Sequence, residues 1–286
     1  MEQGQPSKTA LATGYWRAYH QVLDEPRVLE DPLALRILRL SPDELTDQDT
    51  EPWSRFGGTS GSQLGRRLFF ATRSRFAEEV IGEAVRAGTR QVVFLGAGLD
   101  TFAYRNPFPE LRVFEVDHPA TQSWKRQQLA EADIPVPDSV TFAPVDFETD
   151  SLSDGLAAAG FDRGEPAIFV WLGVVFYLTQ DAFQETLRYI TGQRGSVRLV
   201  LDYLPAPATA DEQAALRDRM ERLMNAGEPF LSMFPPTEME QQLSSAGFTT
   251  VEDHSAAALI EHYRGAPLPE GAALPKPASR LLQAGR

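Results

Sequence analysis

The sequence of 286 residues contains no cysteine. Disulfide bonds, thiolate metal centres and a cysteine nucleophile are therefore excluded. It also has no apolar run that approaches the roughly 18 residues of a membrane-spanning helix. Residues 1–5 lack the basic and then apolar pattern of a secretory signal peptide. Together these absences predict a soluble, cytoplasmic protein.

Positive charge is scarce as well. The 27 Lys and Arg residues stand against 40 Asp and Glu residues, which gives a formal net charge of −13. Nucleic acids and anionic membranes attract the opposite sign of charge, so neither is an expected partner. Paired histidines and calcium-loop patterns are missing, so no metal site is expected. A small-molecule substrate fits this composition best, and nothing in the sequence indicates an oligomeric state.

From residue 91 onward, short apolar segments alternate with helical segments. Strands are expected near 91–95, 112–116, 139–144, 166–172, 196–203 and 248–251. Helices are expected near 119–132, 150–159, 180–191, 209–225 and 236–246. This alternation is typical of parallel β-α-β units. It predicts an α/β fold with a ligand-binding domain over residues 91–263.

The segments on either side of this domain are expected to differ from it. Residues 1–90 should form a helical cap or lid, with a long helix from 62 to 87 that Gly88 ends. Within it, residues 41–61 carry two prolines, five acidic residues and a glycine-rich run, which predicts a mobile loop. Residues 264–286 are rich in Pro, Gly and Ala, so a flexible tail is predicted.

A glycine bend follows the first predicted strand. The apolar run Val92–Leu95 leads into Gly96-Ala97-Gly98, where missing side chains let a ligand lie on the backbone. The second strand ends at Asp117, about 20 residues further on, the distance at which a dinucleotide-type fold brings an acid to ribose hydroxyls. This spacing predicts a site for an adenosyl ligand. Thr101 replaces the third glycine of the dinucleotide fingerprint, so a nicotinamide-dependent dehydrogenase is the remotest alternative.

A third strand, around Val140–Val145, ends in Asp146 and Phe147. In doubly wound sheets, ligands bind at the carboxyl ends of the strands, near the point where the strand order reverses. Gly96, Asp117 and Asp146 should all lie on that edge of the sheet. Either aspartate could instead cap the helix that follows it.

Five motifs, in this order along the chain, resemble the leucine carboxyl methyltransferase family. They are Thr72–Phe76, Leu95–Thr101, Phe114–Pro119, Val145–Phe147 and Trp171–Leu178. The resemblance covers residues 8–205. It implies a class I methyltransferase, an α/β fold with a doubly wound, mostly parallel, Rossmann-like sheet of seven strands, one late strand reversed, and an N-terminal helical lid. It also implies an enzyme whose domain at 91–263 binds S-adenosyl-L-methionine.

For the methionine part of this cofactor, the resemblance implies contacts from the loop 96–98 and an ion pair between Arg73 and the carboxylate. A guanidinium fork suits a carboxylate because it can donate two hydrogen bonds to it. Lys8 lies one residue away from the position of a family lysine that contacts the cofactor. Leu172 stands where many relatives have a glutamate, so one polar cofactor contact is missing or replaced.

For the nucleoside part, the resemblance implies that Asp117 accepts hydrogen bonds from both ribose hydroxyls. Asp146 would face the exocyclic amine of adenine, and Phe147 would pack against the adenine ring. Glu148 stands where family members that methylate protein tails have an arginine that holds the substrate's carboxylate. This reversal of charge argues against a protein C-terminus as the methyl acceptor.

The residues define the chemistry of the acceptor less sharply. A carboxylate, with a pKa of about 4, is already ionised at neutral pH and needs no general base. A phenol, with a pKa near 10, usually needs one. His20 is the histidine that a lid could carry into the site, but no catalytic residue is identified. We therefore predict O-methylation of a small molecule, at a carboxyl group.

Two alternatives stay open. One is methylation of a phenolic or enolic hydroxyl in natural-product biosynthesis, and the other is a cofactor-binding homologue that has lost methyl transfer. In either reaction, acceptor contacts are expected from Tyr15 and His20 in the lid, from Arg105 after the glycine loop, and from Tyr177.

Overall fold

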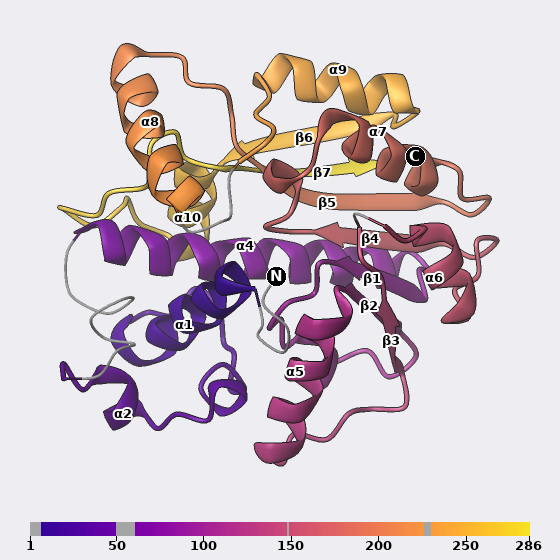
Figure 1. Cartoon of the computed structure of the whole chain (residues 1–286), viewed down its shortest axis with the longest axis horizontal. Helices are drawn as coiled ribbons and strands as arrows, with labels where there is room; N and C mark the ends of the chain where they lie inside the picture. The colour runs from indigo at the N-terminus through magenta and orange to yellow at the C-terminus, as the bar shows by residue number, and fades with distance from the viewer. Residues whose placement is uncertain (1–6, 50–60, 148, 226–229) are drawn as a thin grey trace.

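A mixed sheet of seven strands forms the centre of the protein (Figure 1). The computed structural model describes residues 7–49, 61–147, 149–225 and 230–286. The strands lie in the order β3-β2-β1-β4-β5-β7-β6. Their bounds are β1 Gln91–Leu95, β2 Arg112–Asp117, β3 Val140–Pro144, β4 Ala167–Trp171, β5 Val197–Tyr203, β6 Thr250–Ser255 and β7 Arg280–Gly285.

Strands β1 to β5 run parallel to one another, and β7 runs antiparallel to both of its neighbours, β5 and β6. The strand order reverses between β1 and β4, which is where a doubly wound sheet offers a crevice for a ligand. The predicted fold class is confirmed, including the single reversed late strand.

The prediction of a flexible tail over residues 264–286 is wrong for residues 280–285, which form β7. β7 lies inside the sheet, where Ala284 is paired with Leu199 of β5 on one side and with Val251 of β6 on the other. Leu281 and Leu282 are fully buried. Pairing with two neighbouring strands fixes this short segment, although its composition has little β preference. The domain that contains the sheet therefore extends to residue 285.

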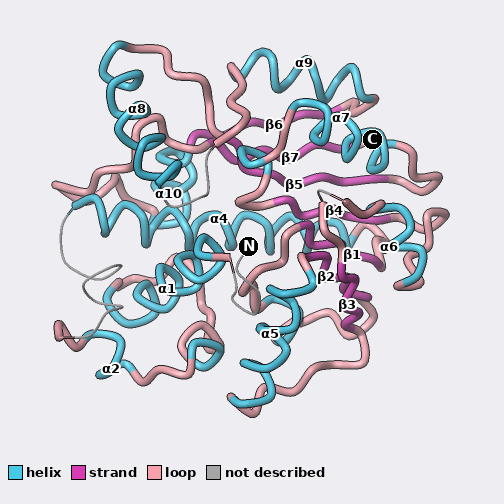
Figure 2. Tube along the Cα trace, in the orientation of Figure 1, coloured by secondary structure: helices cyan, strands magenta, loops and turns pink. Residues whose placement is uncertain are grey.

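Helices cover both faces of the sheet (Figure 2). Buried side chains of α4 and α10 pack on one face, and those of α6, α7 and α9 pack on the other. The bounds of the helices from residue 61 onward are α4 Gly61–Arg86, α5 Pro119–Glu131, α6 Leu152–Ala158, α7 Gln180–Thr191, α8 Ala210–Asn225, α9 Pro236–Ala246 and α10 Ala256–Arg264. In the described part of the chain, no helix is both long enough and apolar enough to cross a membrane.

Helix α4 follows directly from its sequence pattern. Leu68, Phe76 and Val80 recur at helical spacing and are buried against the sheet. The prediction of a helix over 62–87 agrees with the observed bounds to within one residue. Gly88 follows the helix with φ +102°, a left-handed conformation that suits glycine at a helix end.

The N-terminal segment contains α1 Lys8–Leu23, which packs on α4, and α2 Pro42–Thr46. The predicted mobile loop 41–61 is therefore wrong at its start. Ser41 and Glu44 form a capping box, and Leu45 is fully buried. The spacing Ser-x-x-Glu is typical of a helix start, but the two prolines and the acidic residues of this segment favoured the prediction of a loop. Residues 50–60 of that predicted loop lie outside the described residues.

Candidate functional site

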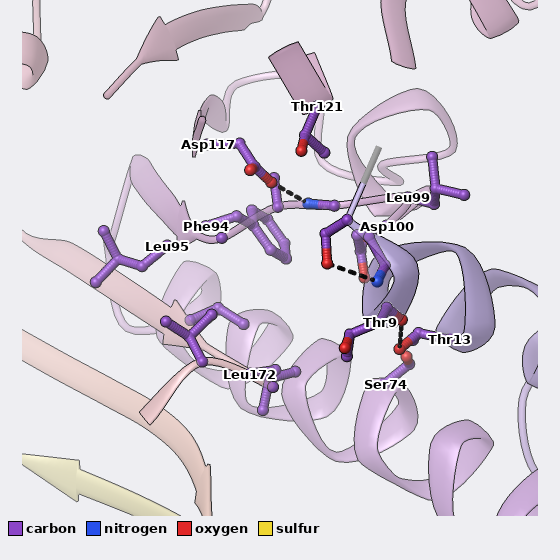
Figure 3. Close-up of a pocket in the computed structure, with 18 of the residues that line it drawn as sticks. Thr9, Thr13, Ser74, Phe94, Leu95, Leu99, Asp100, Asp117, Thr121 and Leu172 are labelled. Carbon is purple, nitrogen blue, oxygen red and sulfur yellow. Dashed lines mark hydrogen bonds between the residues drawn. The ribbon is translucent and has the colours of Figure 1, made fainter. Parts of the chain in front are cut away.

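A cavity lies at the carboxyl ends of β1 and β4, at the reversal of strand order (Figure 3). Its walls come from α1 as far as Arg17, from α4, from the loop after β1, from the end of β2 and the start of α5, and from residues 172–177 after β4. All of these segments except α1 belong to parallel β-α-β units or to the helix that covers them. The cavity is thus placed where the sequence predicted a ligand.

The glycine loop forms one wall of this cavity. Gly96 and Gly98 have φ values of +73° and +45°, which side-chain-bearing residues rarely adopt. A Cβ atom on Gly96 would lie 2.4 Å from Cγ2 of Val174, so the loop and the segment after β4 are in close contact. The backbone N–H groups of Gly96 and Ala97 both donate to the carbonyl of Val116, at 2.8 and 3.1 Å. The structure therefore places the predicted Gly96, Ala97 and Gly98 in the cavity wall in a fixed conformation.

Asp117, at the end of β2, lines the cavity beside this loop (Figure 3). Its Oδ2 accepts a hydrogen bond from the backbone N–H of Gly98 at 2.5 Å, and its Oδ1 accepts one from His118 at 2.7 Å. Burial raises the pKa of Asp117 above its ordinary value, although these two hydrogen bonds act in the opposite direction. The carboxylate is thus oriented by the backbone and partly withdrawn from water.

Arg73 of α4 also lines the cavity, and the structure gives it a partner that the sequence did not predict. Its Nη1 donates to Oδ2 of Asp202 at 3.1 Å, and Oδ1 of Asp202 accepts from the N–H of Gly173 at 2.5 Å. Asp202 lies near the end of β5 and is 1% exposed. Nε of Arg73 is buried without a hydrogen bond. Asp202 therefore holds one side of the guanidinium and leaves donors for a ligand.

Arg17 is a second buried cation in the wall that the sequence did not single out. Its Nη2 donates to the carbonyl of Leu99, and its Nε lies 3.4 Å from Oδ2 of Asp31. Its Nη1 lies 3.8 Å from Oδ2 of Asp100. The sequence did contain an indication of this position. Arg17 follows Ala10 and Thr13 at helical spacing, so the three residues share one face of α1, and this face lines the cavity.

Tyr177 and Leu172, both predicted site residues, lie in the part of the wall that follows β4. The hydroxyl groups of Tyr177 and Thr9 are 3.0 Å apart, which links this segment to α1. Figure 3 shows Thr9 and Thr13 of α1 on the same side of the cavity as Ser74 of α4. This side therefore presents hydroxyl groups.

Three predicted cofactor contacts do not line this cavity. Asp146 lies just beyond the end of β3, the neighbour of β2, and its Oδ2 is 3.5 Å from Nε2 of His118. Phe147 is half-buried and packs against the core between the sheet and α6, α7 and α9. Lys8 is exposed at the first position of α1. Their functions stay predictions.

His20 lies outside the cavity lining, contrary to its prediction as an acceptor contact. The ring is fully buried, and its Nδ1 is hydrogen-bonded to Oδ2 of Asp24 at 2.9 Å. Its Nε2 accepts from the N–H groups of Val28 and Leu29, at 3.0 and 3.3 Å. Since both ring nitrogens bind the fold itself, His20 has no nitrogen available to take a proton from an acceptor.

Arg105 and Tyr15 also lie outside the lining, for similar reasons. Arg105 forms a two-pronged ion pair with Glu78, and its Nε is 3.3 Å from Oδ1 of Asp31. Tyr15 packs on a small buried cluster of the lid that includes Leu45. Both residues stabilise the N-terminal segment instead of facing the cavity. Glu148, whose charge argued against a protein acceptor, lies outside the described residues.

The reversed strand, the glycine bend and the acid that ends β2 together define a class I S-adenosylmethionine-dependent methyltransferase. Within this class, residues 10–191 match the model of the leucine carboxyl methyltransferase family. The chain belongs to this family, as its five sequence motifs predicted, and it is an S-adenosylmethionine-dependent enzyme.

Relatives support this assignment over most of the chain. YktD of Bacillus subtilis, named as an S-adenosyl-L-methionine-dependent methyltransferase, is 30% identical over 277 residues, which cover 88% of this chain and 89% of YktD. A protein of Mycobacterium sp. with the same description is 34% identical over 230 residues, which cover 77% of this chain and 71% of the relative.

Solved structures show the same fold. A DUF574 family protein from Streptomyces avermitilis superimposes with a TM-score of 0.56 and 14% identity, covering 98% of each chain. A methyltransferase-like protein from Thermobifida fusca gives a TM-score of 0.53 and 20% identity, covering 79% of this chain and 82% of that one. At these identities the likeness extends to the fold alone.

Proposed function

We propose that the protein transfers the methyl group of S-adenosylmethionine to a carboxylate of a small molecule and forms a methyl ester. The observation that supports this proposal is the composition of the cavity wall. Among the described lining residues there is no histidine, lysine or glutamate, and both carboxylates, Asp100 and Asp117, belong to the glycine loop and the end of β2 and not to the hydroxyl-bearing side. A phenolic acceptor would need a base there. A carboxylate is already ionised at neutral pH and needs none.

The cavity has unsatisfied groups that fit the cofactor. Nε of Arg73 and the hydroxyl of Thr121 are buried in the wall without a hydrogen bond. Arg73 would bind the cofactor's carboxylate while Asp202 holds its other side. Asp117 would accept hydrogen bonds from the ribose hydroxyls, close to Thr121. Asp146, at the next strand end, would lie nearer the adenine.

The residues on the hydroxyl side would orient the acceptor. When bound, S-adenosylmethionine supplies a methyl group on a sulfonium, which an acceptor oxygen attacks in line. Thr9 and Tyr177 share a hydrogen bond, and the hydroxyl that accepts it would donate to the second oxygen of an acceptor carboxylate and so aim the first at the methyl group. The walls would hold the acceptor in line with the methyl group. The new O–C bond replaces the S–C bond, and no proton has to move.

The proposal is tested by the chemical stability of the product. Wild-type protein is incubated with methyl-labelled S-adenosylmethionine and a panel of small carboxylic acids and phenols. We expect the transferred label to be released as methanol by mild alkali, because esters hydrolyse under these conditions and ethers do not. Asp117→Asn protein, purified in the same way, controls for a contaminating methyltransferase.

Two other results would reject the ester. Label that survives alkali would show methylation of a phenolic or enolic hydroxyl. Calorimetric binding of the cofactor without transfer to any acceptor would favour a homologue that has lost the reaction. The loss of methyl transfer is favoured by one observation: the side chain of Leu172 provides no polar contact in the cavity wall.

The raised pKa of Asp117 predicts a pH dependence of cofactor binding. The ribose hydroxyls donate to the carboxylate, so the ionised form binds the cofactor and the protonated form binds it less well. Because burial raises this pKa, affinity should begin to fall at a higher pH than for an ordinary aspartate as the solution is acidified. Calorimetric titrations with S-adenosylhomocysteine from pH 8 downward measure this. In the Asp117→Asn protein the decline should begin at a lower pH than in wild type, and an identical decline there would refute the assignment.

A further inference from the structure

The methionine part of S-adenosylmethionine carries an ammonium group as well as a carboxylate. Next to buried cations, an ammonium without a negative partner or a hydrogen-bond acceptor would be unfavourable. Arg73 and Arg17, the buried cations of the wall, cannot serve it. The side chain of Leu172 offers no hydrogen-bond acceptor. The wall must therefore provide another group for this charge.

Two carboxylates line the cavity within the described residues, Asp117 and Asp100. Both oxygens of Asp117 accept backbone hydrogen bonds from Gly98 and His118, and the proposed cofactor placement assigns Asp117 to the ribose. A third acid, Asp202, is outside the lining and binds Arg73 and Gly173 through its two oxygens. Asp100 is the remaining candidate.

Asp100 has an oxygen available for a ligand. Its Oδ1 accepts a hydrogen bond from the N–H of Phe102 at 2.8 Å, which fixes the carboxylate at the end of the glycine loop. Oδ2 lies 3.8 Å from Nη1 of Arg17, which is longer than a hydrogen bond. The side chain is 21% exposed, and Figure 3 shows it beside Leu99, among the residues that line the cavity.

We propose that Asp100 binds the ammonium group of the cofactor through Oδ2. Arg17 acts as a positioning residue, because it donates to the carbonyl of Leu99, the residue before Asp100, and attracts the carboxylate from the α1 side. These contacts of Arg17 link α1 to this end of the loop. This inference rests on the cofactor placement proposed above and is independent of the chemical nature of the acceptor.

The test compares two ligands that differ in the ammonium group alone. S-adenosylhomocysteine and its deamino analogue are titrated by calorimetry into wild-type protein and into Asp100→Asn. Asparagine keeps an oxygen for the N–H of Phe102 but places a neutral amide at the ammonium. A hydrogen bond between charged groups corresponds to roughly a tenfold to 100-fold change in affinity. We expect wild-type protein to prefer S-adenosylhomocysteine by about this factor and Asp100→Asn to bind both ligands nearly equally.

Asp117→Asn is the matched control, because it removes a carboxylate from the same cavity. It should weaken both ligands by a similar factor and keep their ratio at the wild-type value. If Asp100→Asn keeps the wild-type ratio, or weakens both ligands alike, the inference is overturned. If Asp117→Asn weakens neither ligand, the cofactor placement itself is wrong, and this inference fails with it. The release of methanol by alkali from the wild-type product does not depend on either result.

Discussion

Replacing Asp117 by asparagine is expected to weaken S-adenosylmethionine binding by roughly 100-fold. Hydrogen bonds to a charged group contribute about 1.5–3 kcal/mol each, and about 1.4 kcal/mol corresponds to a factor of ten in affinity. The proposed assignment gives Asp117 two such bonds from the ribose. Asparagine also has one oxygen in place of the two that hold Gly98 and His118. The loss thus affects both the ligand and the loop on which it lies.

Calorimetry with S-adenosylhomocysteine and methyl transfer at saturating acceptor provide the two measurements. Asp138→Asn is a suitable control, because Asp138 is an exposed aspartate just before β3, at the opposite edge of the sheet. It should leave both quantities unchanged. An Asp117→Asn protein whose affinity stays within threefold of wild type would contradict the proposed cofactor placement.

The parts of the site that lie at strand ends can be predicted from the sequence. Buried parallel strands are recognisable as short apolar runs, and their carboxyl ends must share one edge of the sheet. These two rules are enough to locate Gly96 and Asp117. Arg73 can be located only through the family motif, because a charged residue on a helix is most often exposed to solvent.

The partners of these residues could not be predicted in the same way. Asp202 and Arg73 are 129 positions apart in the sequence, and no local sequence pattern indicates a contact between residues so far apart. An acid near the end of β5 was the available signal, and it repeats the pattern of Asp117 at the end of β2. Arg17 was missed because a charged residue on a helix is most often exposed to solvent.

The prediction for His20 shows what a residue type alone leaves open. A histidine in a lid can face the site or bind the fold, and the sequence does not distinguish the two. In this structure Nε2 of His20 accepts hydrogen bonds from the N–H groups of Val28 and Leu29, which follow α1 in the chain. β7 was missed for a related reason, because tertiary pairing with β5 and β6, and not local composition, makes it a strand.

Replacing Asp24 by alanine is expected to lower the free energy of unfolding by about 3–5 kcal/mol. Asp24, at the end of α1, accepts hydrogen bonds from Nε and Nη2 of Arg67 on α4, at distances from 2.9 to 3.2 Å. It is also hydrogen-bonded to Nδ1 of His20 at 2.9 Å. All three side chains are buried. The alanine variant keeps the buried guanidinium of Arg67 and removes a carboxylate that accepts hydrogen bonds from it.

The pKa of Asp24 agrees with a stabilising ion pair. Burial alone would raise this pKa, but the hydrogen bonds from His20 and Arg67 outweigh it and lower the pKa below the ordinary value. A carboxyl group whose pKa is lower in the folded state stabilises the fold above its unfolded pKa. That contribution is lost as the pH falls through the folded pKa. At neutral pH it is therefore fully present, and the variant should lose it there.

Urea unfolding of wild-type and Asp24→Ala proteins at pH 7, without cofactor, measures the difference. Glu30→Ala is the matched control, since Glu30 also pairs with an arginine, Arg27, but its side chain is 75% exposed. Exposed pairs contribute about 0–1 kcal/mol, so this control should change little. Equal effects of the two substitutions would show that the buried pair contributes no more than a surface pair. A large effect of Asp24→Ala alone would show that the buried contact between the end of α1 and α4 stabilises the fold as expected.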